Sequence, residues 1–194
     1  MKGRKPKYTK DLLLEKASAL FWKKGYSNCS TAELLEAMDI NKGTMYHLFQ
    51  SKENLYVLCL SHLEDAWFAQ MNERIETSEK PFGVISDFFN TICREDAETR
   101  ELGCILGNTL IESYQGHPGL KEVTISYLQD LHKLFERAVY RSVEIGEKQF
   151  SQPPKETADL LLNFYNGIQI TKRMPYPSDH LAYLVHHQID QILV

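Results

Sequence analysis

Residues 41–47 carry side chains whose types and spacing fit one kind of chemistry, hydrogen bonding to nucleic acid. They are Asn41, Lys42, Gly43, Thr44, Tyr46 and His47. Amide, ammonium, hydroxyl and imidazole groups donate hydrogen bonds to base edges and to phosphate oxygens, and a glycine lets the backbone approach a ligand closely. We call these six residues the donor set, and they predict a surface that contacts double-stranded DNA in its major groove.

The first of two short helices that must position the donor set is predicted to begin near Thr31. Ser30 and Glu33 have the spacing of a capping box, in which each side chain accepts a hydrogen bond from a backbone N–H of the other. Apolar residues recur at offsets of three and four along this helix, so they share one face that must be buried. These residues are Leu34, Leu35 and Met38.

The second short helix follows a tight turn and carries the donor set. Asn41 offers its side-chain oxygen as an N-terminal cap. Met45, Leu48 and Phe49 form the inward stripe, which leaves the donor set facing outward. A short helix with donors at its N-terminal end has the shape that enters a DNA major groove.

Several short motifs occur in a characteristic order between Leu12 and Leu55. They are Ala-Leu-Phe at 19–21, Lys-Gly-Tyr at 24–26, Lys-Gly-Thr at 42–44, Tyr-His at 46–47, Phe49 and Ser-Lys-Glu at 51–53. In this combination the segment resembles the DNA-binding domain of the TetR family of bacterial repressors. Asp39 stands where that family usually has glycine, and Leu48 where many members have a second histidine. Asp39 either repels phosphate or adopts the left-handed conformation that Asp tolerates.

The resemblance implies a role for each polar residue of this segment. Contacts to base edges are expected from Asn41, Lys42, Gly43 and Tyr46, and contacts to phosphates from Thr31, Thr44, His47 and Lys52. Lys52 would act from the positive N-terminal end of a long helix. Arg4 belongs to a basic arm, residues 1–10, which either adds phosphate or minor-groove contacts or is a solvated tail.

Charge and composition agree with this interpretation. Residues 1–53 contain ten Lys or Arg and six Asp or Glu, a net charge of +4. The whole chain has a net charge of −4, so the remaining residues carry −8. The basic end is therefore the predicted DNA end. No apolar run approaches the roughly 18 residues that a membrane helix needs. We expect a cytoplasmic protein with no membrane partner.

Helical patterns continue to the end of the chain, and no stretch predicts a strand. We expect an all-α fold of about nine helices, with a helix-turn-helix DNA-binding domain over residues 1–50 and a helical ligand-binding and dimerisation domain over residues 51–194. Ser51 is expected to cap a helix from Lys52 to about Thr77 that connects the two domains. A charged break is expected over residues 94–101.

Aromatic residues of the second domain predict an apolar cavity, which the resemblance implies is an inducer pocket. Its expected lining is Phe88, Phe89, Cys104, Tyr114, Phe135 and Phe164. Taken singly, each aromatic is also explained as core. The sequence does not identify the small molecule.

The last two predicted helices carry apolar stripes that suit pairing with a second copy of the chain. The stripe residues are Leu161, Tyr165, Ile168, Leu181, Val185 and Ile189. A two-fold dimer would place two recognition helices on the half-sites of a palindromic operator. The alternative is that both stripes belong to the core of a single chain.

Cys104 permits a second hypothesis about regulation. The run Gly103-Cys104-Ile105-Leu106 is similar to a stretch of TetR-like repressors that sense electrophiles or oxidants through a cysteine, and Lys172 or Arg173 falls near the place of a partnering lysine. A cationic neighbour would make the thiol more reactive. The alternative is a small buried apolar residue.

The functional prediction is a ligand-responsive transcriptional repressor that needs neither metal nor cofactor. Three histidines near the C-terminus lack metal-ligand spacing and are expected at the surface; they are His180, His186 and His187. An α-helical enzyme is one alternative, although the chain contains no phosphate-binding glycine loop or nucleophile motif. A DNA-binding architectural protein without sequence specificity is the other.

Overall fold

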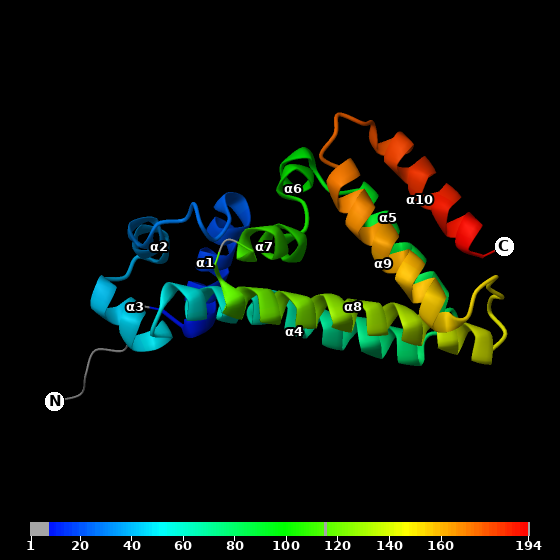
Figure 1. The fold of residues 1–194 in the computed structure, drawn as a ribbon, viewed down its shortest axis with the longest axis horizontal. Helices are drawn as coiled ribbons and strands as arrows, with labels where there is room; N and C mark the ends of the chain where they lie inside the picture. Colours follow the sequence, from blue (N-terminus) through cyan, green and yellow to red (C-terminus); the bar gives the residue numbers. More distant parts are fainter. Residues whose placement is uncertain (1–7, 115, 194) are drawn as a thin grey trace. The chain divides into compact units, whose positions relative to one another are not determined.

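The structure is a computed structural model that describes residues 8–114 and 116–193, and it confirms the predicted all-α fold (Figure 1). Over these residues the chain forms ten α-helices and no strand. Two compact units result. The first unit contains the residues up to Ala66 together with Thr109–Thr124, and the second contains Trp67–Asn108 and the residues from Ile125 onward.

The first unit is built on three helices whose ends are fixed by local caps. They are α1 (Lys10–Lys24), α2 (Thr31–Met38) and α3 (Lys42–Phe49). The Thr9 side chain accepts a hydrogen bond from the Leu12 N–H and caps α1. Both halves of the predicted capping box at Ser30 and Glu33 are present at the start of α2. Gly25 ends α1 with a φ of 79°, a conformation that favours glycine.

Three further helices contribute residues to the first unit. The N-terminal part of α4 (Lys52–Thr77) belongs to it, as do the end of α7 (Ile105–Ser113) and the start of α8 (Pro118–Glu144). The Ser51 hydroxyl accepts the Asn54 N–H at 2.9 Å and caps α4 as predicted. The core of the unit consists mainly of fully buried side chains from α1 to α4: Leu13, Ala17, Phe21, Leu34, Met45, Phe49 and Leu55.

The second unit contains the remainder of α4, α7 and α8 and four helices of its own. The latter are α5 (Pro81–Cys93), α6 (Ala97–Leu102), α9 (Pro154–Thr171) and α10 (Ser178–Ile192). Helix α6 lies where the sequence predicted a charged break. The Asp96 carboxylate accepts the Thr99 N–H at 2.8 Å and caps α6. This short helix has no buried residue, so the sequence contains no apolar stripe that would predict it.

Residues 109–124 follow the second unit's α5 and α6 in sequence but pack with the N-terminal helices. The compact units therefore do not follow a single cut in the chain. The division into a DNA-binding domain over 1–50 and a ligand-binding domain over 51–194 stays a functional prediction.

Candidate functional site

The turn between α2 and α3 adopts the geometry that presents α3. Asp39 has φ 54° and ψ 47°, so it occupies the left-handed conformation that the sequence offered as one alternative. Its N–H donates to the carbonyl of Glu36 at 3.1 Å, and the Ile40 N–H donates to the carbonyl of Leu35 at 3.2 Å. An aspartate can thus occupy a position where this turn ordinarily favours glycine.

Helix α3 turns its apolar stripe inward and its donor set outward, as predicted. Met45 and Phe49 are completely buried, whereas Tyr46, between them in sequence, is 42% exposed. The Asn41 side-chain oxygen accepts the Thr44 N–H at 2.8 Å and caps the helix. Lys42 extends beside Tyr46, with its Nζ 5.9 Å from the ring centroid.

The donor set forms one surface. Five of its members are exposed (Asn41, Lys42, Gly43, Tyr46 and His47), and Thr44 is half-buried. Thr31, a predicted phosphate contact, is half-buried at the start of α2. Arg4 lies outside the described residues. The surface offers amide, ammonium, phenol and imidazole donors within two turns of helix, which suits hydrogen bonding to base edges and phosphates.

Lys52, the remaining predicted phosphate contact, has a partner inside the protein. Its ammonium donates to the Tyr26 carbonyl at 2.6 Å and lies 4.3 Å from the centroid of the Tyr26 ring. Burial lowers the pKa of Lys52 from its ordinary value. This contact fastens the start of α4 to the segment between α1 and α2.

The capping box at the start of α2 also holds an ionised carboxylate, that of Glu33. The Glu33 carboxylate accepts the Ser30 N–H at 2.9 Å and the Ser30 hydroxyl at 2.7 Å, and it forms an ion pair with Lys24. The hydrogen bond from Lys24, followed by that from the Ser30 backbone, lowers the pKa of Glu33 to about 2. The carboxylate is therefore ionised throughout the physiological range.

Within the first unit, the segment that begins at Thr109 contacts the N-terminal helices and α4 in ways that the sequence analysis missed. The Glu112 carboxylate accepts the Ser27 N–H at 2.9 Å. The Tyr56 and Thr109 hydroxyls lie 2.5 Å apart in a buried hydrogen bond. The His117 ring meets the Tyr26 ring edge-on at 4.7 Å. No local pattern signals these contacts, because they join residues 53 or more positions apart.

Residues 13–59 match the model of a family described as "Bacterial regulatory proteins, tetR family". The helix-turn-helix segment of this chain is therefore similar to that of TetR-family regulators. The chain is 32% identical over 110 residues to "HTH-type transcriptional repressor ComR" of Escherichia coli (strain K12), a match that covers 55% of this chain and 52% of that protein. It is 30% identical over 108 residues to "HTH-type transcriptional regulator QacR" of Staphylococcus aureus, covering 54% and 53%. The chain thus spans about half the length of these relatives.

Solved structures of the TetR family share the fold of nearly the whole chain. The reduced form of E. coli NemR superposes with a TM-score of 0.83 at 19% identity, covering 95% of this chain and 96% of that one. A cysteine mutant of the TetR family regulator CifR, solved with a 26-base-pair double-strand operator DNA, gives a TM-score of 0.82 at 21% identity, covering 96% and 98%. Within residues 8–114 and 116–193, every helix is too short or too polar to span a lipid bilayer.

Four of the residues predicted to line a TetR-type inducer pocket form one aromatic cluster in the second unit. Phe89 lies centrally, with ring centroids at 5.5 Å from Phe88, 5.9 Å from Phe135 and 5.0 Å from Phe164. Tyr165 joins the cluster, stacked 5.7 Å from Phe88. Phe89 and Phe135 are fully buried, whereas Phe88 and Phe164 are half-buried.

Tyr114 requires a correction, because it does not belong to this cluster. It follows the last residue of α7 and lies in the first unit, where its side chain is 70% exposed. Its ring contacts the Lys121 ammonium at 4.4 Å. Helix α7 ends at Ser113, so Tyr114 does not continue a buried helical stripe.

Cys104 borders the aromatic cluster. The Tyr165 hydroxyl donates to its sulfur at 3.2 Å, and the Gly107 N–H donates to it at 3.4 Å. The charged ends of the two predicted cationic partners bind other groups. Lys172, 2% exposed, forms a 2.5 Å ion pair with Glu95, and Arg173 donates to the Leu102 carbonyl and the Asn108 side chain.

The stripes predicted to form a dimer interface are buried within one chain. Leu161, Tyr165, Ile168, Leu181, Val185 and Ile189 are all between 0% and 8% exposed and belong to the core of the second unit. This corresponds to the alternative of an intramolecular core. The reason is that α10 packs against α5 and α9, which uses its apolar face.

The outward faces of α9 and α10 carry large exposed side chains that the sequence analysis did not single out. On α9, Leu160 is 45% exposed and Ile170 is 66% exposed. On α10, Tyr183 is 60% exposed. Tyr183 lies in a ladder of rings, 6.2 Å from His180 and 5.8 Å from His187.

Proposed function

We propose that this protein is a transcriptional repressor that binds a palindromic DNA operator as a homodimer and is released by a small molecule or a reactive species. The observation that carries the proposal is the exposed donor set on α3, held by the Asn41 cap and the left-handed turn at Asp39. The relative ComR is named a transcriptional repressor, and CifR was solved on operator DNA, which supports the proposal.

In the proposed complex α3 lies in the major groove. The Asn41 oxygen is occupied by the Thr44 N–H, so the Asn41 amide nitrogen is the group that meets an acceptor on a base edge. Lys42 and Tyr46 reach base edges beside it, and Thr31, Thr44 and His47 hold phosphates. Lys52 has three N–H donors, so it can retain the Tyr26 carbonyl and add a phosphate.

The proposed dimer pairs the outward faces of α9 and α10 with their copies. Exposed Leu160, Ile170 and Tyr183 supply the apolar area that a stable interface needs. A two-fold axis through this surface would give two α3 helices for two half-sites.

The proposed response to an inducer begins in the aromatic cluster and at Cys104. Helix α7 begins one residue after Cys104 and contains Glu112, whose carboxylate binds the Ser27 N–H. A ligand in the cluster, or a modified thiol, would move α7 and thereby alter the contact of Glu112 with the segment between α1 and α2. The ligand acts through its differential affinity for the two conformations.

The test of this function compares the affinity of the protein for the DNA upstream of its own gene with its affinity for a scrambled duplex of equal length. We expect preference by about a thousandfold and weaker binding of both duplexes at higher salt. Equal affinity for both duplexes would instead support an architectural DNA binder. The variant Lys133→Ala, which removes an exposed α8 lysine outside the donor set, should bind both duplexes as the unmodified protein does.

A further inference from the structure

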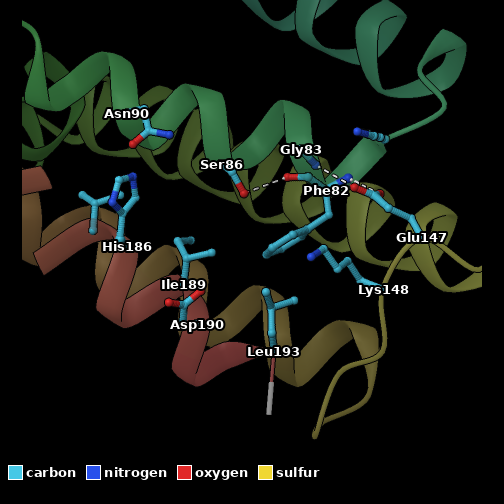
Figure 2. Close-up of a pocket in the computed structure, with 12 residues that line it drawn as sticks. Phe82, Gly83, Ser86, Asn90, Glu147, Lys148, His186, Ile189, Asp190 and Leu193 are labelled. Atoms are coloured by element: carbon cyan, nitrogen blue, oxygen red, sulfur yellow. Dashed lines mark hydrogen bonds between the residues drawn. The ribbon is translucent and has the colours of Figure 1, made fainter. Parts of the chain in front are cut away.

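A cavity lies in the helical unit that contains α5 and α10, apart from the aromatic cluster. Its volume is about 460 Å³, within the range of roughly 300 to 1,000 Å³ that is usual for small-molecule sites. Figure 2 shows α5 on one side and α10 on the other, with Glu147 and Lys148 from the segment that follows α8 at one end. None of the aromatic-cluster rings lines it.

The middle of this cavity is apolar. Phe82 at the start of α5 is 1% exposed and Ile189 on α10 is 7% exposed, so both present buried hydrocarbon to the cavity. Leu193, half-buried, continues the same wall beyond α10 (Figure 2). A hydrocarbon chain or ring placed here would lose its contact with water, which favours binding in proportion to the area covered.

One end of the cavity carries an available positive charge. Glu147 uses both carboxylate oxygens to accept the N–H groups of Phe82 at 2.9 Å and Gly83 at 3.1 Å. Among the described residues, the neighbouring Lys148 ammonium forms no hydrogen bond or ion pair. Figure 2 shows the Lys148 side chain extending toward Phe82 and Leu193.

The opposite end differs in charge. Asn90 and His186 lie there, and the exposed Asp190 carboxylate lies between His186 and Leu193, beside Ile189 (Figure 2). A second carboxylate on a ligand would be repelled by Asp190. A cationic ligand head would meet the ammonium groups of Lys148 and Lys80, which outnumber the single Glu147 carboxylate at that end.

We propose that this cavity binds an amphiphilic monocarboxylate, with the carboxylate on the Lys148 ammonium and the hydrocarbon tail along Phe82, Ile189 and Leu193. The site is separate from the aromatic cluster and does not depend on DNA binding. A ligand bound there would bridge α5, α10 and the segment after α8.

Calorimetric titration of the full chain with sodium octanoate tests this site. Hexanoate and octylamine are the comparison ligands, and Lys148→Glu is the test variant. Lys155→Glu is the matched control, because Lys155 is an exposed lysine of α9 that does not line the cavity. Thermal melts of both variants confirm folding before titration.

We expect octanoate to bind the unmodified protein and K155E alike and to bind K148E at least about tenfold more weakly, since the substitution replaces attraction by repulsion. Octanoate should bind roughly tenfold more tightly than hexanoate because two further methylenes are buried. Octylamine should bind K148E better than it binds the unmodified protein. Equal affinity of octanoate for K148E and K155E, equal affinity for octylamine and octanoate, or no binding of octanoate would each overturn the proposal.

Discussion

The Glu112 carboxylate accepts the Ser27 backbone N–H at 2.9 Å, although 85 residues separate them. It also fills the space beside Gly25, where an added Cβ would collide with its oxygen. This single side chain therefore joins the end of α7 to the segment that leads from α1 into α2. In the proposed repressor it is a positioning residue for the DNA-binding helices.

Replacing Glu112 by Ala should lower the free energy of unfolding by about 1 kcal/mol, because the Ser27 N–H loses its partner. Glu112→Gln retains an acceptor and should lose less. Chemical denaturation measures both. Glu122→Ala, at an exposed position on α8, is the control. If E112A and E122A have the same stability, the Ser27 contact contributes nothing.

The capping box should make stability depend on pH in the acid range. The Glu33 pKa is lowered from 4.5 to about 2 in the folded chain. Stability from this ionised carboxylate is therefore fully present above pH 4.5 and is lost as the pH falls toward 2. The stability difference between the unmodified protein and Glu33→Gln, measured by denaturation, should be constant near neutral pH and shrink below 4.5. A difference that does not change with pH would contradict this assignment.

Alanine substitutions at two adjacent residues of α3, Met45 and Tyr46, should affect different properties: stability for Met45 and DNA affinity for Tyr46. Tyr46→Ala removes the proposed contact to a base edge, so operator affinity should fall by about 5-fold to 150-fold. Because this side chain is exposed, the melting temperature should stay nearly constant. Met45→Ala opens a cavity at a fully buried position and should lower the free energy of unfolding by about 2 to 5 kcal/mol. Fluorescence anisotropy on operator DNA and thermal melts distinguish the two. Y46A with unchanged affinity would remove Tyr46 from the interface.

Cys104 should be the first of the four cysteines to react with N-ethylmaleimide. Burial raises the thiol pKa values of Cys29 and Cys93, and raises that of Cys59 to about 12. The half-buried Cys104 instead accepts hydrogen bonds from Tyr165 and Gly107, which favour a thiolate.

Peptide mass spectrometry over time measures this order, and Tyr165→Phe should slow the labelling of Cys104 by removing the hydroxyl donor. An unchanged labelling rate in Y165F would exclude that role of Tyr165. If diamide releases a Cys104→Ser variant from DNA as readily as the unmodified protein, Cys104 is not the sensor.

A charge on the outward face of α9 should weaken the proposed dimer. Ile170 is 66% exposed, so Ile170→Asp should leave the monomer folded and increase the dissociation constant of the dimer by about tenfold or more. Ile168→Asp, at a position that is 2% exposed, should unfold the second unit instead. Analytical ultracentrifugation and circular dichroism separate these outcomes. A monomeric unmodified protein, or an unchanged I170D dimer, would refute this interface.

The sequence by itself determined most helix ends and the orientation of α3. Capping at Ser30, Asn41 and Ser51 depends on residues three positions apart, so the pattern is complete within the local chain. The same locality explains the inward Met45 and the outward Tyr46. The short α6 was missed because it has a cap at Asp96 but no buried stripe.

Only the tertiary structure decided what each apolar face is packed against. The stripe of α10 required burial, but a period of 3.6 residues is the same whether the partner is α5 of one chain or a second molecule. The structure assigns Val185 and Ile189 to the core of one chain. The contact of Glu112 with Ser27 was equally invisible in the sequence, because folding brings together residues that no local spacing relates.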